Sequence, residues 1–306
     1  MGDAKAGRSS IAKVIFQKMV SKSTKLLGET SKMETYDFKI QKIEFKLYDF
    51  PAKYDINDPP PSEQMIFRNA AALIYVLSPQ SDILKAMDNF HNIYNYIKKK
   101  NTNNCSIFIF TNKADIDLTQ SDARNEYLIK LKKKISEDEI DIKEIEFYFT
   151  SINDSSIFEA FSKVVQKMIP CSPNICKLLN HFANHSKIEK AYLFDLVTKL
   201  YIGHNDEKLT DQYRYDICSD ILDIFIDISY LYDKDKHHDS ESKTTVKLNY
   251  EEENEMVALR VMEKYLALVF IIKESNYDRP YLIDENVTVF RKGLSELLNQ
   301  TIAVLK

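Results

Sequence analysis

Glycine, proline and tryptophan are scarce in this 306-residue chain, which has 5 Gly, 8 Pro and no Trp. So few Gly and Pro residues exclude collagen-like or low-complexity material and favour long regular elements. The net charge of -4 provides no basic field, so nucleic acid is not an expected partner. In contrast, 44% of the residues are hydrophobic, which is enough for one large or two ordinary domains.

The chain also lacks patterned cysteines and any long apolar run. Its 4 cysteines are scattered without the spacing of a disulfide framework or a zinc site, which indicates a reducing compartment. The longest strongly apolar run, 266–272, is far short of the roughly 20 residues that a membrane helix needs. Position 6 is Ala, whereas N-myristoylation needs Ser or Thr there. We therefore expect a cytoplasmic protein without direct membrane insertion, which partners would hold at any membrane.

The first half of the chain has the pattern of an α/β domain. Continuous apolar runs at 70–77, 105–110 and 145–149 are typical of parallel strands buried on both faces. Apolar residues recur at helical spacing between the first two runs and again after the third, at 157–168. The alternating segment 43–48 predicts a half-exposed edge strand. Strands that alternate with helices indicate a parallel sheet wrapped by helices.

Pro170 and Pro173 mark a boundary between a first domain, 1–170, and a second, 174–306. Consecutive strands with flanking helices predict a smaller α+β domain with an antiparallel sheet after this boundary. The polar tract 233–242 is expected to be a solvated loop. In order, we expect a helix at 174–184, a strand at 190–202, a helix around 217–228, two or three strands within 244–273 and a helix around 287–298.

Residues 2–10 (GDAKAGRSS) match the phosphate-loop pattern at every fixed position but one. Gly2 and Gly7 would let backbone N–H groups wrap a phosphate, and the Ser9 hydroxyl would bind Mg²⁺. Ser10 would be a further nucleotide-binding residue of the loop. Arg8 replaces the usual Lys; it keeps the charge, but its planar fork is bulkier. Only Met1 precedes this loop, so we expect the first strand of the sheet to be missing, because of a truncated gene model or an unusually short subunit.

Residues 111–115 (TNKAD) follow the buried strand 105–110, at the carboxyl end where open α/β sheets bind ligands. The Asp115 carboxylate can accept hydrogen bonds from N1–H and N2–H₂ of guanine, and adenine offers no such pair of donors. Asn112 would brace the loops, and the Lys113 stem would cover the face of the base. The alternative is a polar strand-to-helix turn in which Asp115 caps a helix.

Two further loops follow predicted strands. Asp49, after the strand 43–48, could hold Mg²⁺ through a water, and the alternative there is an ordinary turn. Thr150, Ser151 and Ile152, after the strand 145–149, could contact the base through backbone and hydroxyl groups. The four loops occur in the order that a bound guanine nucleotide requires, and together they predict a site for GTP or GDP with Mg²⁺.

With these motifs in place, the chain resembles the Rag GTPases of the C/D subclass over nearly its whole length. This resemblance implies a Ras-like P-loop GTPase domain followed by a roadblock-type dimerisation domain. It also implies an A/B-type Rag subunit as obligate partner, a scaffold complex on the lysosome or vacuole, and recruitment of the TOR kinase complex when amino acids are plentiful. The segments that carry it are 63–68 (EQMIFR), 72–76 (ALIYV), 150–152 (TSI), 156–167 (SIFEAFSKVVQK), 188–191 (IEKA), 193–195 (LFD) and 290–292 (FRK).

By position, Thr30 looks like the first-switch threonine, which in this family senses the γ-phosphate and Mg²⁺. The family pattern Asp-x-Pro-Gly-Gln has Ala52 and Lys53 in its last two positions here. Ala52 would restrict loop closure, and Lys53 cannot accept a hydrogen bond from the attacking water. With Arg8, these departures predict a slow GTPase at best. Two alternatives stay open: a pseudo-GTPase scaffold that mainly dimerises, and a trafficking GTPase of the Arf or Rab kind, which the second domain and the lack of lipid sites disfavour.

Overall fold

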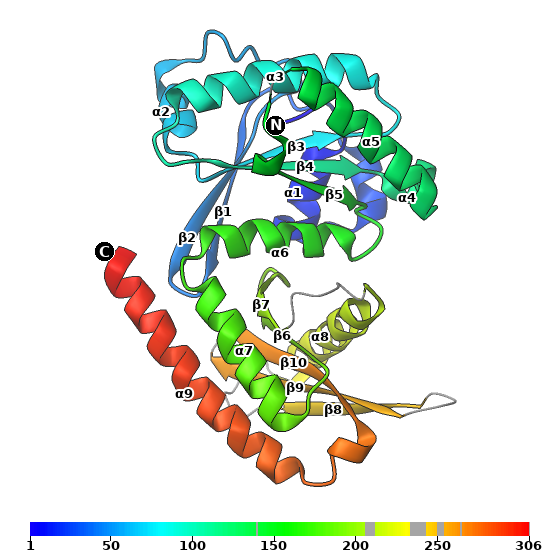
Figure 1. The fold of residues 1–306 in the computed structure, drawn as a ribbon, viewed down its shortest axis with the longest axis vertical. Helices are drawn as coiled ribbons and strands as arrows, with labels where there is room; N and C mark the ends of the chain where they lie inside the picture. Colours follow the sequence, from blue (N-terminus) through cyan, green and yellow to red (C-terminus); the bar gives the residue numbers. More distant parts are fainter. Residues whose placement is uncertain (139, 206–211, 233–242, 250–253, 264, 306) are drawn as a thin grey trace. The chain divides into compact units, whose positions relative to one another are not determined.

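The computed structural model describes residues 1–138, 140–205, 212–232, 243–249, 254–263 and 265–305. The chain forms two compact units, Met1–Phe38 with Phe45–Val164, and Lys39–Glu44 with Val165–Lys306. Figure 1 shows a mixed α/β first unit and a second unit built around a larger sheet. None of the described helices is both long and apolar enough to span a bilayer.

The first unit contains the expected parallel sheet, with the order β3-β4-β5. Ala72 pairs with Ser106 at the start of the β3–β4 ladder, and Asn112 pairs with Thr150 at the end of the β4–β5 ladder. The elements are α1 (Arg8–Gln17), η1 (Ser21–Leu26), β1 (Glu34–Ile40), β2 (Ile43–Asp49), α2 (Pro61–Asn69), β3 (Ala72–Leu77), α3 (Ile83–Lys100), β4 (Ser106–Asn112), α4 (Ala114–Asp117), α5 (Ser121–Glu137), η2 (Ile142–Glu144), β5 (Ile145–Thr150) and α6 (Ser156–Met168).

The sheet is covered on both faces because its strand residues alternate between two cores. Ile107 and Ile109 of β4 belong to the core that contains buried residues of α2, α3 and α5. The next residue, Phe110, turns to the other face, where its ring lies 6.3 Å from that of Phe161 in α6, edge to face. Phe161 in turn contacts Phe16 of α1. Helices α2, α3 and α5 therefore lie over one face of the sheet and α1 and α6 over the other, in three layers (Figure 1).

The start of the chain lies beside β3. Gly2 and Val76 form a parallel bridge, and the Asp3 backbone N–H donates to the Val76 carbonyl at 3.0 Å. Among the described residues, this end of the chain pairs with β3 through a single bridge. The predicted strand 43–48 is found as β2, but its partner β1 was not predicted. The two strands form a separate two-stranded sheet.

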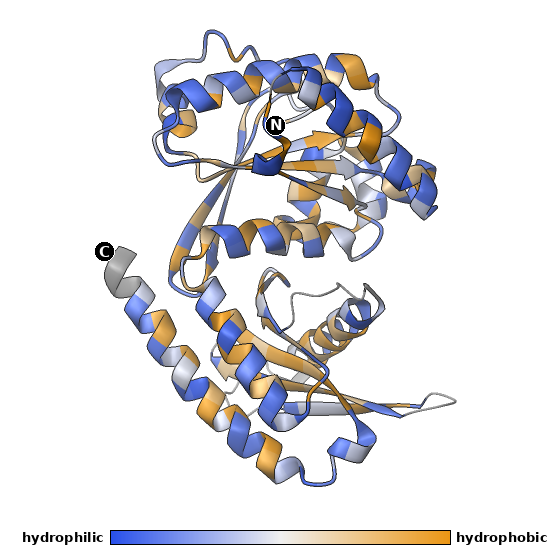
Figure 2. Cartoon of the chain, in the orientation of Figure 1, coloured by the Kyte–Doolittle hydropathy of each residue, from blue (hydrophilic) through white to orange (hydrophobic). Residues whose placement is uncertain are grey.

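The second unit has an antiparallel sheet of order β7-β6-β10-β9-β8, as expected in class. Figure 2 shows hydrophobic residues concentrated in its central strands. The buried core on one face includes residues of α8, and on the other face Phe182 of α7 packs against Phe270 and Phe290. The elements are α7 (Ser172–Ser186), β6 (Lys190–Asp195), β7 (Tyr201–His204), α8 (Gln212–Tyr232), β8 (Lys243–Leu248), β9 (Glu255–Glu263), β10 (Leu266–Lys273), η3 (Glu274–Asn276) and α9 (Pro280–Leu305).

The prediction of one strand over 190–202 was wrong, because a turn divides this segment into β6 and β7. Asp195 ends β6, and its carboxylate accepts hydrogen bonds from the backbone N–H and the hydroxyl of Thr198, both at 2.8 Å. Lys199 then takes a positive φ of 60°. An aspartate that bonds the backbone just ahead of it favours a turn over a strand. The predicted loop 233–242 lies outside the described residues.

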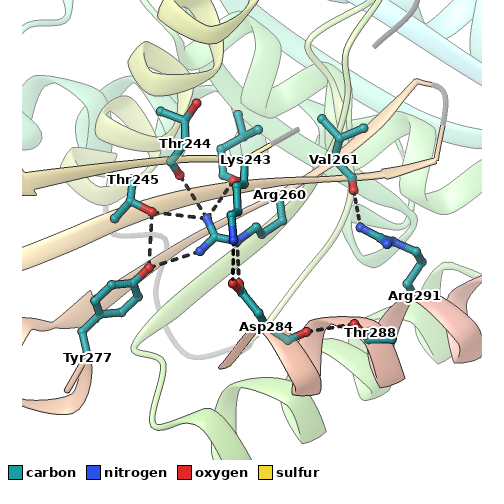
Figure 3. Close-up of polar contacts among 10 residues, drawn as sticks. Lys243, Thr244, Thr245, Arg260, Val261, Tyr277, Asp284, Thr288 and Arg291 are labelled. Carbon is teal, nitrogen blue, oxygen red and sulfur yellow. Dashed lines mark hydrogen bonds and ion pairs between the residues drawn. The ribbon is translucent and has the colours of Figure 1, made fainter. Parts of the chain in front are cut away.

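A buried arginine ties the edge of the second sheet to the last helix. Arg260 of β9 is only 5% exposed, yet its Nε donates to the Asp284 carboxylate of α9 at 2.8 Å. Its two terminal nitrogens donate to the Thr244 carbonyl of β8 at 3.1 Å and to the Tyr277 hydroxyl at 3.1 Å. Figure 3 shows that β8, β9 and α9 converge on this one guanidinium. A buried charge is tolerated when it is paired and hydrogen-bonded in this way.

Candidate functional site

A cavity of about 920 Å³ opens at the carboxyl ends of the strands in the first unit. Its walls come from the loop before α1, the segment 21–31, the segment after β2, and the loops after β4 and β5. The predicted site residues that line it are Gly7, Arg8, Ser9, Ser10, Thr30, Asn112, Lys113, Asp115, Ser151 and Ile152. Three other predicted site residues do not line the cavity. Two of them, Asp49 and Thr150, each form a hydrogen bond with a lining residue, whereas Gly2 packs on β3.

Helix α1 presents its N-terminus to this cavity. Its first turn contains no acidic residue, and Gly7 at the N-cap offers no side chain, so the N–H groups of this turn face the cavity without a protein cap. Such a helix end attracts anions through its N–H groups and its dipole. Gly7 has a φ of 89°, and a Cβ there would lie 2.6 Å from the Asn112 amide nitrogen. Only glycine fits this close approach.

The hydroxyl of Ser9 lies between the two other predicted metal ligands. Ser9 Oγ is 2.6 Å from Thr30 Oγ1 and donates to Asp49 Oδ2 at 2.5 Å. Asp49 is the last residue of β2 and is 5% exposed, while Thr30 belongs to the irregular segment between η1 and β1. Two hydroxyls and one carboxylate thus converge at the α1 terminus from three separate segments. Oxygen ligands of this kind suit a hard divalent cation such as Mg²⁺.

Asn112 joins the loops on either side of the cavity. Its amide nitrogen donates to the Ala6 carbonyl at 2.8 Å, and its amide oxygen accepts from the Thr150 hydroxyl at 3.4 Å. The side chain is 1% exposed, so both bonds are shielded from water. Lys113 follows with a positive φ of 65°, and its ammonium donates to the Lys5 carbonyl at 2.9 Å. The loop before α1 is therefore anchored twice to the end of β4.

Asp115 is held by a neighbour that the sequence analysis missed. Asn153 Nδ2 donates to Asp115 Oδ2 at 2.9 Å, while Asp115 Oδ1 is buried without a hydrogen-bond partner among the described residues. Burial raises the pKa of Asp115, but hydrogen bonds from Asn153 and Ser151 outweigh it and hold the pKa below its usual value. Asp115 is the second residue of α4, whose N-cap is Lys113, so the alternative that it caps this helix is wrong.

The charge of the cavity wall is mixed but mostly positive on the phosphate-loop side. Arg8 donates a hydrogen bond to the Phe50 carbonyl, so its guanidinium links the loop before α1 to the segment after β2. Lys53 and half-buried Ala52 line the cavity in that same segment. Gly2 instead packs on β3, where an added Cβ would lie 2.2 Å from the Val76 carbonyl oxygen. Its proposed phosphate contact stays a prediction.

A parallel sheet with these loops at the carboxyl ends of its strands and an uncapped helix after a glycine loop is the arrangement of a nucleotide-binding α/β domain. Comparison with known proteins gives the family. Residues 1–222 match the family model "Gtr1/RagA G protein conserved region". The chain belongs to this family.

Within the family, the chain is similar to members of the C/D type. It is 37% identical over 304 residues to the human Ras-related GTP-binding protein C, covering 97% of this chain and 75% of the relative. It is 35% identical over 310 residues to GTP-binding protein gtr2 of Schizosaccharomyces pombe, covering 98% and 96%. The gtr1 protein of the same yeast is 28% identical and covers 74% of each chain. The C/D subclass expected from the sequence is therefore confirmed.

Proposed function

We propose that this chain is the guanine-nucleotide-binding, C/D-type subunit of a Rag heterodimer. The observation that carries the proposal is the carboxylate of Asp115, which lines the cavity at the end of β4 with Oδ1 unpaired. A buried acceptor without a partner favours binding of a base that can donate from N1–H and N2–H₂, and guanine offers both donors. Ser151 and Ile152 lie on the same wall, where their backbone groups can contact the base.

The phosphates would lie against the N-terminus of α1. Gly7 and the N–H groups that follow it suit an anion, and Arg8 and Lys5 add positive charge to the same wall. Ser9, Thr30 and Asp49 would hold Mg²⁺, because each supplies an oxygen atom, and those of Thr30 and Asp49 lie within hydrogen-bond distance of the Ser9 hydroxyl. When bound, the ion would neutralise phosphate charge. A γ-phosphate would then order the segments around Thr30 and Asp49, which makes the site a switch.

We expect weak or absent intrinsic hydrolysis of GTP. The ammonium of Lys53 carries only donors, so it cannot accept a hydrogen bond from an attacking water. Ala52 carries a Cβ where a closing loop would bring a backbone N–H to the γ-phosphate. Arg8 is already engaged with the Phe50 carbonyl of this segment, which favours one position of the loop.

The second domain, 174–306, is proposed to be a roadblock-type module that pairs with the corresponding domain of an A/B-type Rag subunit. Among the described strands, β7 and β8 are the two edges of this sheet, and an edge strand such as β8 can pair with another chain. Exposed apolar side chains on α8, such as Ile224 and Leu231, add apolar surface. The pair would act in amino-acid signalling to the TOR kinase complex, recruited from the cytoplasm to the lysosome or vacuole by a scaffold complex.

Identification of the nucleotide that copurifies with the protein tests the proposal. The full chain would be coexpressed with an A/B-type subunit that cannot bind nucleotide, and the pair purified with Mg²⁺ present. The bound base would then be extracted and identified by chromatography and mass spectrometry. We expect guanosine phosphates in near-stoichiometric amounts and no adenosine phosphates. A stable heterodimer that carries no nucleotide would contradict the proposal.

A pseudo-GTPase scaffold is the second candidate. The contact between Arg8 and the Phe50 carbonyl favours it, because this bond ties the phosphate loop to the segment after β2 with protein groups alone. In that case the subunit would contribute mainly its dimerisation surface. The same purification separates the candidates, since a scaffold would give a stable heterodimer with an empty cavity.

A further inference from the structure

Asn153 lies beside the carboxylate of Asp115, which is proposed to select the base. It follows Ser151 and Ile152 in the loop after β5, lines the same cavity, and donates its Nδ2 hydrogen to Asp115 Oδ2 at 2.9 Å. We infer that Asn153 is a positioning residue that fixes the Asp115 carboxylate in the orientation that accepts guanine. This inference rests on the proposed function and adds to it the residue that sets the fidelity of base selection.

The two oxygens of Asp115 are not equivalent in this arrangement. Oδ2 accepts from Asn153, whereas Oδ1 is buried and has no hydrogen-bond partner among the described residues. An ionised carboxylate has about four lone-pair sites on its two oxygens. The hydrogen bonds from Asn153 and Ser151 thus leave Oδ1 for N1–H and N2–H₂ of the base. Because an unpaired buried acceptor is costly, a base that supplies both donors gains the most.

Asp115 needs such a support because its own element is small. Helix α4 has only 4 residues, and its N-cap supplies no side-chain hydrogen bond. Without a neighbour, the carboxylate could rotate away from the cavity. A hydrogen bond to one oxygen fixes the plane of the group, and it also favours the ionised form, which presents acceptors only.

The loop that carries Asn153 is held in place by its own hydrogen bonds. The Asn153 backbone N–H donates to the Ser151 hydroxyl at 3.0 Å, and the Ser151 N–H donates to the Ser156 hydroxyl at 2.9 Å. Ser156 is the first residue of α6, and Ser151 is 1% exposed. The Asn153 side chain therefore lies on a loop between β5 and α6 that hydrogen bonds hold in one conformation, as a positioning residue requires.

Two substitutions separate positioning from simple loss of structure. Asn153→Ala removes the donor, and Asn153→Asp keeps the shape but replaces the donating NH₂ by an acceptor oxygen beside a carboxylate. Asn125→Ala is the matched control, because Asn125 is an exposed residue of α5 that does not line the cavity. Each variant would be purified as full chain with the A/B-type partner, and its melting temperature compared with that of the unsubstituted complex.

The readout is the equilibrium affinity for GDP and for inosine diphosphate, whose base lacks the 2-amino group. We expect Asn153→Ala to weaken GDP binding about 10-fold and to narrow the preference for GDP over inosine diphosphate, with a larger loss for Asn153→Asp. In an Asp115→Ala background, Asn153→Ala should change nothing further. A merely structural role would lower both affinities equally and leave their ratio unchanged.

Two results would overturn the inference in different ways. If the unsubstituted complex binds GDP and Asn153→Ala binds both nucleotides as the Asn125→Ala control does, Asn153 has no positioning role and the proposed function survives. If the unsubstituted complex binds no guanosine phosphate, the proposed function fails and this inference falls with it.

Discussion

Asn112 donates a hydrogen bond from its amide nitrogen to the carbonyl of Ala6 at 2.8 Å, joining residues 106 positions apart in the sequence. The loop before α1 takes its place from this bond and from the one between Lys113 and the Lys5 carbonyl. Gly7 completes the fit, since a Cβ at this residue would collide with the same amide. The end of β4 thus fixes both the phosphate side and the base side of the cavity.

Asn112→Ala should loosen this loop. The substitution leaves the buried Ala6 carbonyl without its donor, so we expect a loss of about 1–3 kcal/mol in the stability of the first unit. Nucleotide affinity should fall as well, because the N-terminus of α1 is no longer held against β4. Differential scanning calorimetry and GDP titration of the heterodimer measure the two effects. Asn125→Ala is the control, and an Asn112→Ala protein that melts and binds as the control does would refute this account of the loop.

Ser9→Ala should weaken the dependence of nucleotide binding on Mg²⁺. The Ser9 hydroxyl lies within hydrogen-bond distance of both Thr30 and Asp49, so its loss takes away the central oxygen of the proposed metal site. We expect GDP affinity in Mg²⁺ to fall about 10-fold, and the difference between Mg²⁺ and EDTA to shrink. Ser136→Ala on the exposed side of α5 is the control. An unchanged response to Mg²⁺ would remove Ser9 from the metal site.

Lys53→Gln should speed up hydrolysis. Glutamine supplies an acceptor for the attacking water where Lys53 offers only donors, so we expect single-turnover GTP hydrolysis to rise about 10-fold. Ala52→Gly together with Lys53→Gln should give a larger increase, because the loop can then close. Lys99→Gln, an exposed change on α3, controls for lost charge. A fast rate in the unsubstituted subunit, or no gain in the double variant, would show that these residues do not limit hydrolysis.

Asp284→Asn should change how the second unit responds to acid. Partial burial raises the pKa of Asp284, but the hydrogen bonds and charges of Arg260 and Lys243 outweigh it and lower the pKa below the usual value. A folded-state pKa below the unfolded one stabilises the fold above the unfolded pKa, near 3.9, and this gain disappears as pH falls through the folded pKa.

We therefore expect Asp284→Asn to cost roughly 1–3 kcal/mol at pH 7, less than a fully buried pair would, because the carboxylate is partly exposed. The melting curves of the substituted and unsubstituted proteins should begin to approach each other below about pH 4 and should meet only below the lowered folded-state pKa, where both side chains are neutral. Calorimetry between pH 3 and 7 measures this, with Glu285→Gln on the same helix as control. Equal losses for the two variants at pH 7 would show that the ion pair adds nothing.

Long, strongly patterned elements could be predicted from the sequence. The apolar runs at 70–77, 105–110 and 145–149 became β3, β4 and β5, of which β4 is buried along almost its whole length and β5 only half-buried in its middle. The helical spacing between the first two runs and after the third was found as α3 and α6. Because parallel strands of one sheet end at the same side, Asn112 and Thr150 could be placed near each other from the sequence, whereas Asp49 ends a strand of a separate sheet. All three prove to be the last residues of their strands.

Contacts across the fold could not be predicted. Asn153 and Asp115 lie 38 positions apart, and an asparagine in a polar loop gives no sign of its partner. Arg260 and Asp284 pair only because β9 and α9 pack together, which the sequence does not specify. The turn between β6 and β7 had a local signal, Asp195 followed by Thr198, but the apolar residues around it resembled one strand.

The base preference of Asp115→Asn tests the central claim most directly. The measurement is equilibrium binding of GDP, ADP and xanthosine diphosphate to the heterodimer, with this subunit unsubstituted or carrying Asp115→Asn. We predict that the unsubstituted subunit prefers GDP. The Asp115→Asn subunit should have an affinity for GDP about 100-fold lower, and it should gain affinity for xanthosine diphosphate, whose 2-oxo group accepts a hydrogen bond from the new amide. An unsubstituted subunit that binds ADP as well as GDP, or a variant that binds GDP unchanged, would contradict the account.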